Sequence, residues 1–291
     1  MFSLFSFFQK HNIYNKHISY IMEQNIEQQV TRGGINPTAL PKSFPFATEI
    51  ISLPSEGLCY PETHPLSKGT IEIKLLTAKE EDILTSTNLI RKGIVLDKLL
   101  ESIIVDNNIK MDDLVIGDKN AILVASRVLA YGPEYDVVIN DPIENEPVNV
   151  KVDISKLSIK EVDETILNRN NEYDFLLPKT KVAIKFKLLT HADEMAIQKD
   201  TEASEKISKQ PNEITSRYRR IIIEVDGNRD LGYISNFVMN QLQAADSKAL
   251  RKYINEITPD VDFTFEYVSP FTGEKEALKV PIGVDFFYPA D

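Results

Sequence analysis

Two segments of this chain repeat each other, and the repeat constrains the fold more than any other feature. The sequence KLLTAKEEDIL at 74–84 matches KLLTHADEMAI at 187–197. Further on, DKNAIL at 118–123 matches DSKALR at 246–251, at a wider spacing along the chain. Two matches in the same order indicate an internal duplication, so each copy is expected to form the same supersecondary unit.

The wider spacing then holds for a long way, and it aligns Pro142 with Pro270, Glu146 with Glu274, and Lys151 with Lys279. The second copy is therefore longer than the first, and its additional residues lie in the polar stretch 198–217. Its few hydrophobic residues and single proline indicate a surface insertion in the second copy. The duplication therefore predicts a first repeat over residues 46–157 and a second over 158–291.

Each copy shows the same order of predicted elements. Residues 69–76 and 181–189 alternate apolar and polar side chains, which is typical of strands. Thr77 precedes Glu80 by three residues, a capping box that starts a helix, and Thr190 with Asp193 is a weaker copy. In both repeats, apolar residues at helical spacing follow, and they predict a helix.

Later signals in each copy predict another helix and then two strands. Asp118 and Asp246 are predicted as N-caps of a helix that ends at a proline, Pro133 or Pro259. The alternating sequence DFTFEYV at 262–268 predicts a half-buried strand. The predicted class is α+β: two tandem related modules, each a small mostly antiparallel sheet with a terminal β-hairpin covered by helices.

The predicted hairpin tips are candidate metal sites, because many small hairpins hold a zinc ion at a Cys-x-x-Cys tip. A structural zinc site needs four thiolate or imidazole ligands, commonly two from each hairpin. The first tip offers Asp141 and Glu144, and the second offers Ser269 and Thr272. These residues predict metal-free β-turns held by proline and glycine. A weak calcium or magnesium contact at Asp141 and Glu144 is the alternative.

No catalytic pattern is present in the sequence, and no catalytic, cofactor-binding or metal-binding residue is predicted. Phosphate-binding glycine loops, nucleophile elbows and zinc-protease motifs are all missing. Cys59 is the single cysteine, which excludes an intramolecular disulfide, and it is interpreted as an ordinary thiol. Carboxylates adjacent in sequence, such as Glu80–Glu81 and Asp112–Asp113, do not face each other on a helix and are interpreted as solubilising charge. The dispersed histidines are His11, His17, His64 and His191, of which His191 is predicted to be exposed in the first turn of a helix.

The net charge of −11 argues against a nucleic-acid partner, because an acidic protein gains nothing from releasing counterions at phosphates. The tight basic group Arg217, Arg219 and Arg220 is interpreted as a solvated edge. Residues 1–45 are predicted to be a flexible amino-terminal arm, with 1–21 interpreted as an upstream extension of the reading frame. No apolar run is long enough to span a bilayer, so no membrane association is predicted.

Four stretches carry a resemblance to a known family: LPSEGLCYP at 53–61, IEIKLLTAKEEDIL at 71–84, GDKNAILVASRVLAYGPEYDV at 117–137, and the segment from Asp246 to Pro289. They resemble the baseplate hub assembly proteins of contractile-tailed, T-even-like bacteriophages. Members of that family often have Cys-x-x-Cys at the hairpin tips, and this chain departs from the pattern at both tips. The resemblance therefore implies a hairpin retained after its zinc ligands were replaced.

The resemblance implies a non-enzymatic late protein that takes part in building the baseplate hub of the phage tail. Its implied partners are other hub or tail proteins, in the host cytoplasm during assembly or in the virion. The alternative is a tail assembly chaperone that binds the tape-measure protein and is absent from the mature particle. An unrecognised enzyme is a third possibility, to be tested by mutating clustered polar residues.

Overall fold

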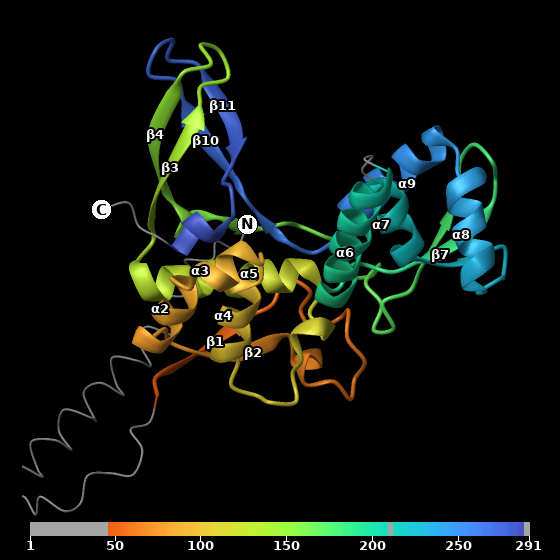
Figure 1. Ribbon diagram of the computed structural model, residues 1–291, viewed down its shortest axis with the longest axis horizontal. Coiled ribbons are helices and arrows are strands. Elements are labelled where there is room, and N and C mark those ends of the chain that lie inside the picture. The colour runs from red at the N-terminus through yellow and green to blue at the C-terminus, as the bar shows by residue number, and fades with distance from the viewer. Residues whose placement is uncertain (1–45, 209–211, 288–291) are drawn as a thin grey trace, which may run out of the picture.

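The computed structural model describes residues 46–208 and 212–287 and has a mixed α+β fold (Figure 1). Helices and several small antiparallel sheets share one continuous hydrophobic core. The predicted α+β class is therefore confirmed. The predicted arm over 1–45, including the extension 1–21, lies outside the described residues.

The first part of the chain pairs two strands and covers them with helices. Strand β1 (Thr48–Ser52) is antiparallel to β2 (Thr70–Lys74), with Ile51 opposite Ile71. Short 3-10 helices lie at Pro65–Lys68 (η1) and Met111–Asp113 (η2). The α-helices are α2 (Ala78–Leu84), α3 (Thr87–Arg91), α4 (Val95–Ile103) and α5 (Ile116–Tyr131).

The second part contains a three-stranded sheet in the order β6-β7-β8, formed by Tyr173–Leu176, Ala183–Phe186 and Ile222–Val225. Its helices are α6 (His191–Ser208), α7 (Glu213–Ile221), α8 (Leu231–Asn240) and α9 (Ala244–Ile257). Within the polar stretch 198–217, residues 198–208 form the second half of α6 and residues 213–217 form the start of α7.

The two predicted capping boxes form at the starts of α2 and α6. The Thr77 amide donates to the Glu80 carboxylate at 3.0 Å, and the Thr190 amide donates to Asp193 at 3.2 Å. Glu80 is buried and also accepts from the Ser102 hydroxyl at 2.6 Å. Its interpretation as solubilising charge is therefore wrong, because this carboxylate ties α2 to α4.

The prediction that Asp118 and Asp246 are N-caps is also wrong, since Val115 and Gln243 occupy those positions. Each aspartate lies at the third residue of its helix, where a negative charge still favours the helix N-terminus. Their carboxylates are instead used by loops distant in sequence. Asp118 accepts from the Ser55 amide after β1, and Asp246 accepts from the Lys179 and Thr180 amides after β6.

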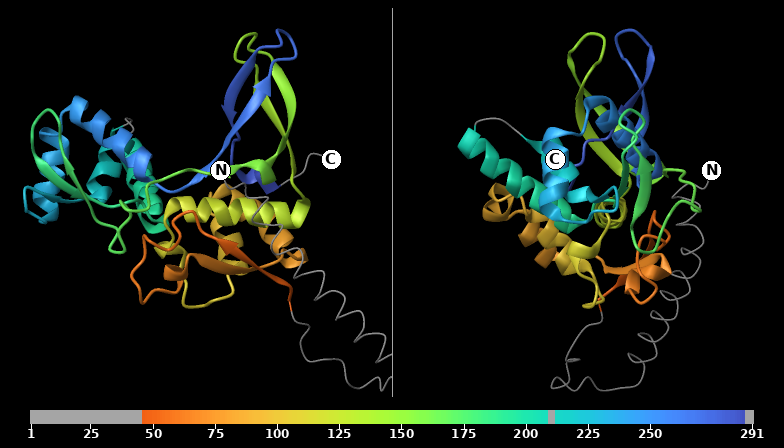
Figure 2. Two further views of the ribbon diagram at one scale, coloured as in Figure 1. Left: turned by 180° about the vertical axis from the view of Figure 1, so that it is seen from behind. Right: turned by 90° about the vertical axis from the view of Figure 1, so that its right-hand side faces the viewer.

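Two hairpins complete the molecule, and they form sheets of their own. The first pairs β3 (Glu134–Asn140) with β4 (Pro147–Asp153), and the second pairs β10 (Thr264–Val268) with β11 (Lys275–Lys279). Both project side by side from the helical part, as seen in Figures 1 and 2. The helices therefore cover the small sheets but do not cover the hairpins, which differs from the predicted arrangement.

The two parts of the chain are joined at several places. Strand β5 (Ser158–Ile159), which follows the first hairpin and the 3-10 helix η3 (Ile154–Lys156), pairs with β9 (Val261–Asp262), which precedes the second hairpin. At the start of α5, Gly117 lies so close to the backbone of Pro259 that a Cβ there would be 1.8 Å from its carbonyl oxygen. A glycine is required at this contact because any side chain would force the backbones apart.

The end of the described chain returns to the first part. In the 3-10 helix η4 (Val284–Phe287), the carbonyl of Phe286 accepts a hydrogen bond from Arg127 Nε on α5 at 2.8 Å. Arg127 is buried, and its other guanidinium nitrogens donate to the carbonyls of Gly132 and Glu134. The Phe286 ring packs edge-on against Tyr135 at the base of the first hairpin.

Candidate functional site

The two hairpin tips, residues 141–146 and 269–274, have the same backbone hydrogen bonds at the positions that the sequence repeat aligns. The Asp141 amide donates to the Glu146 carbonyl at 2.8 Å, and the Ser269 amide donates to the Glu274 carbonyl at 2.9 Å. In each tip, the side chain of the first residue accepts from amides two and three positions later. The residue with a left-handed backbone is Asn145 in one tip and glycine in the other.

A buried contact fastens one hairpin to the other. The Tyr267 hydroxyl on β10 donates to Asp141 Oδ2 at 2.7 Å, and both side chains are buried. Hydrogen bonds hold the pKa of Asp141 well below its usual range. The Glu144 amide has the largest effect, and the Ser269 and Tyr267 hydroxyls add to it. The carboxylate is therefore ionised at neutral pH, and the two hairpins form one prong, which we call the paired hairpins.

The alternative of a weak calcium or magnesium contact at Asp141 and Glu144 receives little support from this geometry. Both Asp141 oxygens already accept hydrogen bonds, Oδ1 from the Ile143 and Glu144 amides and Oδ2 from Tyr267. Within residues 46–208 and 212–287, no group of three or more His, Cys, Asp or Glu side chains could hold a metal ion. Ser269 likewise uses its hydroxyl to accept tip amides.

Apolar side chains are exposed along the paired hairpins. Ile143 and Phe271 occupy equivalent positions in the two tips and are 41% and 56% exposed. Val138 and Val268 lie on the strands and are also exposed. Exposed apolar residues gathered at a projecting end are typical of a protein-binding surface rather than of a catalytic site.

The junction between the two parts of the chain contains a buried polar cluster around His191. The prediction that His191 is exposed is wrong: it is 4% exposed, because the first turn of α6 packs between α4 and α5. Lys119 Nζ on α5 lies 3.1 Å from His191 Nδ1 and 3.3 Å from Asp97 Oδ1 on α4. Burial, followed by the nearby Lys119 charge, lowers the pKa of His191, so the imidazole is neutral at pH 7.

The cluster has the residue types of a general acid and base, but its geometry serves a structural role. His191 Nε2 lies 3.5 Å from Asp97 Oδ1, which fixes the ring between Lys119 and that carboxylate. Glu194 adds a second carboxylate 3.6 Å from Lys119 Nζ. The His191 amide also donates to the Leu114 carbonyl at 2.8 Å. These contacts join α6 to the first part of the chain.

Asp118 organises a second buried network near the loop after β1. It accepts from the Ser55 hydroxyl and from the Tyr60 hydroxyl, each at 2.6 Å. Burial raises the pKa of Asp118 to about 6, although these donors oppose the rise. Tyr60 in turn accepts from the Val115 amide at 3.1 Å, so the network connects the loop to the start of α5.

Cys59 and His64 lie near this loop and have structural surroundings. Burial raises the pKa of the Cys59 thiol to about 12, so a nucleophilic thiolate does not form at neutral pH, in line with the interpretation of an ordinary thiol. His64 Nδ1 accepts from the Leu66 amide at 3.2 Å and caps η1. His11 and His17 lie outside the described residues.

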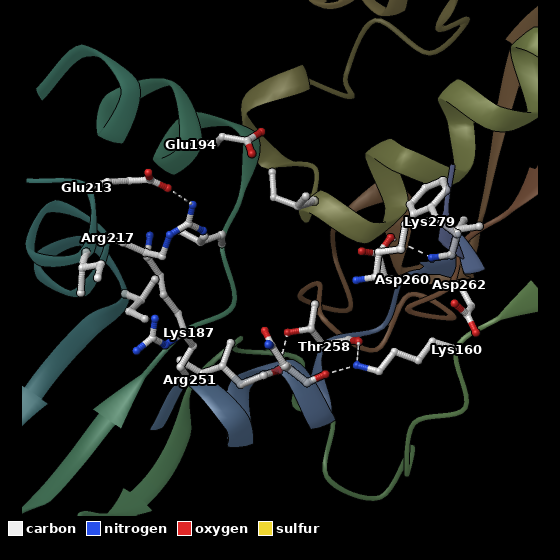
Figure 3. A pocket seen from close by; sticks show the side chains of 18 of the residues that line it. Lys160, Lys187, Glu194, Glu213, Arg217, Arg251, Thr258, Asp260, Asp262 and Lys279 are labelled. Atoms are coloured by element: carbon white, nitrogen blue, oxygen red, sulfur yellow. Dashed lines mark hydrogen bonds and ion pairs between the residues drawn. The ribbon is translucent and has the colours of Figure 1, made fainter. Parts of the chain in front are cut away.

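A cleft of about 940 Å³ lies beside the junction (Figure 3). Its walls come from α6, α7, α9 and the β9 region, and they carry charges of both signs: Lys160, Lys187, Arg217, Arg251 and Lys279 with Glu194, Glu213, Asp260 and Asp262. Lys160 reaches the end of α9, where it donates to the carbonyls of Asn255 and Thr258. Several of these charges are paired within the protein, since Lys187 contacts Asp193, Arg217 contacts Glu213 and Glu194 contacts Lys119.

The basic group on α7 is partly neutralised. Arg217 pairs with Glu213 at 3.3 Å one turn earlier, as Figure 3 shows, and Arg220 pairs with Asp200 at 3.4 Å. Arg219 donates to the Ser216 hydroxyl. This arrangement fits the interpretation of a solvated edge better than that of a phosphate-binding surface.

The sequence did not indicate the paired hairpins as a unit. Tyr267 and Asp141 are 126 residues apart, and each reads by itself as an ordinary strand or turn residue. The sequence repeat indicates that both tips have the same local structure, but it does not indicate that they pack together. The equivalence of Ile143 and Phe271 was the only available signal, since two apolar residues at turn positions are unusual.

Comparison with known proteins gives one match. A family model described as T4 bacteriophage base plate protein matches residues 60–288. No curated protein and no solved structure matches the chain. Among the helices of the described residues, none is both long and apolar enough to serve as a membrane span.

Proposed function

Because the chain belongs to the T4 bacteriophage base plate protein family, we propose that it acts without catalysis in the assembly or structure of the baseplate hub, through protein–protein contacts. Membership of this family supports other phage structural proteins as partners and the virion tail as the location. The participation in the hub, rather than in another part of the baseplate, rests on the resemblance described above.

The observation that carries the proposal is the paired hairpins. They project from the helical part (Figure 2). The residues at their free end include the exposed apolar side chains of Ile143 and Phe271. By contrast, the buried titratable side chains His191, Asp118 and Glu80 are used in contacts that hold segments together. A projecting apolar surface on a rigid base favours docking over chemistry.

The alternative function is a tail assembly chaperone that binds the tape-measure protein and leaves before maturation. Both functions need protein-binding surfaces, so the two are distinguished by the composition of the particle. Quantitative mass spectrometry and cryo-electron microscopy of purified virions provide the test. Presence at a fixed copy number supports a baseplate component. Absence from virions, together with tape-measure binding in infected cells, contradicts it and supports the chaperone.

We also propose that the two halves of the chain, 46–157 and 158–291, arose by duplication. The equal registers support this, since Asp136 faces Lys151 in the first hairpin and the residues aligned with them, Thr264 and Lys279, face each other in the second. The matching roles of Asp118 and Asp246 support it further. An experimental structure tests the proposal, because the two units must superimpose over strand, loop, helices and hairpin in the same order.

A further inference from the structure

We propose that the tips of the paired hairpins dock into an apolar pocket rimmed by lysine and arginine on a partner protein. The proposal rests on the proposed function in one respect, which is that the chain works through protein contacts. It adds the site on this chain, the side chains that enter the partner, and the chemistry of the surface that receives them.

The first step concerns the side chains that enter the pocket. Ile143 and Phe271 stand at equivalent turn positions, and the backbone of each tip is fixed by hydrogen bonds to its first side chain. Because the backbone of each tip is already fixed, binding through these two side chains costs little backbone conformational freedom. Aromatic and large aliphatic residues at such a position are typical anchors of an interface.

The second step concerns the charge around these side chains. Residues 141–146 and 269–274 contain four carboxylates and no lysine or arginine. Asp141 is buried, whereas Glu144, Glu146 and Glu274 are exposed. The ion pairs between hairpin strands join Lys151 to Glu134 and Asp136, and Lys275 to Glu266. The tips therefore offer apolar anchors within a negative rim, which complements a positive rim on the partner.

The third step concerns rigidity. The Tyr267–Asp141 hydrogen bond holds the hairpins together at their tips, and the edge-on contact of Tyr135 with Phe286 holds the first hairpin at its base. The two anchors are thus presented at a fixed spacing. A partner that receives both needs one preformed pocket with room for an aliphatic and an aromatic side chain.

Site-directed cross-linking tests the proposal in infected cells. Phe271 is replaced in the full chain by the photoreactive analogue p-benzoylphenylalanine, and the cross-linked peptides are identified by mass spectrometry. Leu231, which is 78% exposed on α8, carries the same analogue in the control. The expected result is an adduct from position 271 to a peptide with apolar residues and neighbouring lysine or arginine.

The outcomes separate this proposal from the proposed function. An adduct to such a peptide in a baseplate protein supports both. An adduct to such a peptide in a protein outside the tail supports the pocket and contradicts the baseplate role. No adduct at position 271, or an adduct to an acidic or polar surface, overturns the pocket. Adducts from position 231 to baseplate proteins then show that the proposed function stands without it.

Substitutions at the tips give a second readout, which is the amount of partner that co-purifies with the tagged chain. Phe271→Ser and Ile143→Ser are each expected to lower this amount about tenfold, as an anchor residue does. Leu231→Ser is the matched control and leaves it unchanged. The triple variant Glu144→Gln, Glu146→Gln, Glu274→Gln is expected to bind less partner. The amount of partner that it binds should also depend much less on salt concentration. Wild-type binding by the serine variants overturns the proposal.

Discussion

Asp118 shows how a single buried carboxylate joins segments far apart in the sequence. Its oxygens accept from the Ser55 amide, the Ser55 hydroxyl and the Tyr60 hydroxyl, which fixes the loop after β1 against α5. Asp246 makes the corresponding contacts with the Lys179 and Thr180 amides. Both aspartates lie at helix starts, so they stabilise the helix and the loop together.

Replacing Asp118 is therefore expected to be costly. Asp118→Ala leaves the Ser55 and Tyr60 donors buried without an acceptor, and each unsatisfied donor costs about 1–3 kcal/mol. The removal of a buried charge offsets part of this loss, so we expect the free energy of unfolding to fall by about 3 kcal/mol. Urea unfolding measures it, with the exposed Asp82→Ala as control. A change within about 0.5 kcal/mol of wild type would contradict this role for the network.

The His191 cluster predicts a pH dependence of stability. Burial and Lys119 lower the pKa of His191 below its ordinary value of 6.5, so the unfolded chain binds a proton more readily than the folded protein. Stability from this residue is therefore complete above pH 6.5 and is lost as the pH falls below it. The loss is at most about 1.4 kcal/mol for each pH unit.

Chemical unfolding at several pH values between 5 and 8 checks this expectation. The variant His191→Gln keeps a polar side chain without a titrating ring, so its stability should fall less between pH 6.5 and pH 5. Asp97, Lys119, Glu194 and Asp112 face the imidazole and remain in both proteins. Equal slopes for the two proteins would show that His191 does not titrate in this range.

At the scale of elements, much of the fold follows from sequence patterns. Alternation predicts β2 and β7, and Thr77 with Glu80 predicts the start of α2. The failures concern residues whose role depends on a distant partner. An aspartate near the start of a helix has the sequence signal of an N-cap, so Asp118 is predicted to be one. Its actual partner, Ser55, is 63 residues away in the sequence. His191 reads as exposed because helix periodicity does not reveal that α6 begins against α4 and α5.

The contact between α5 and the segment before β9 gives a prediction at this scale. Alanine normally stabilises a helix relative to glycine by about 1 kcal/mol. At Gly117 the added Cβ would lie 1.8 Å from the Pro259 carbonyl oxygen, so α5 and that segment must separate. We expect Gly117→Ala to destabilise the protein by about 2 kcal/mol or more. Thermal unfolding measures the effect, and Gly283→Ala, where no atom lies within 4 Å, is the control.

The paired hairpins give another prediction. Tyr267→Phe removes the hydroxyl that donates to Asp141 but keeps the ring in place. The hairpins should then open locally more often, so their backbone amides should exchange hydrogen about tenfold faster while those of α5 stay unchanged. Hydrogen exchange with mass spectrometry checks this, with Tyr233→Phe on α8 as control. Unchanged exchange in β10 and β11 would mean that the hairpins hold together without this bond.

At the scale of the whole molecule, net charge determines how the free protein meets its partners. A charge of −11 keeps the subunit soluble and steers it toward basic surfaces. We expect its association with baseplate proteins to weaken as ionic strength rises, since salt at 1 M reduces the screening length to about 3 Å. Surface binding measured from low to high salt checks this. Affinity independent of salt would indicate docking by apolar contacts alone.

The return of η4 to the first part of the chain has a consequence for synthesis. Arg127 and Tyr135 lie in the earlier half, yet their partner Phe286 is among the last residues described. Translation proceeds at about 5–20 residues per second, so on the order of ten seconds separate the two. During that interval the surface of Tyr135 that Phe286 covers in the folded protein has no partner from η4. These contacts of Arg127 and Tyr135 can therefore form only after the segment that holds Phe286 has been synthesised.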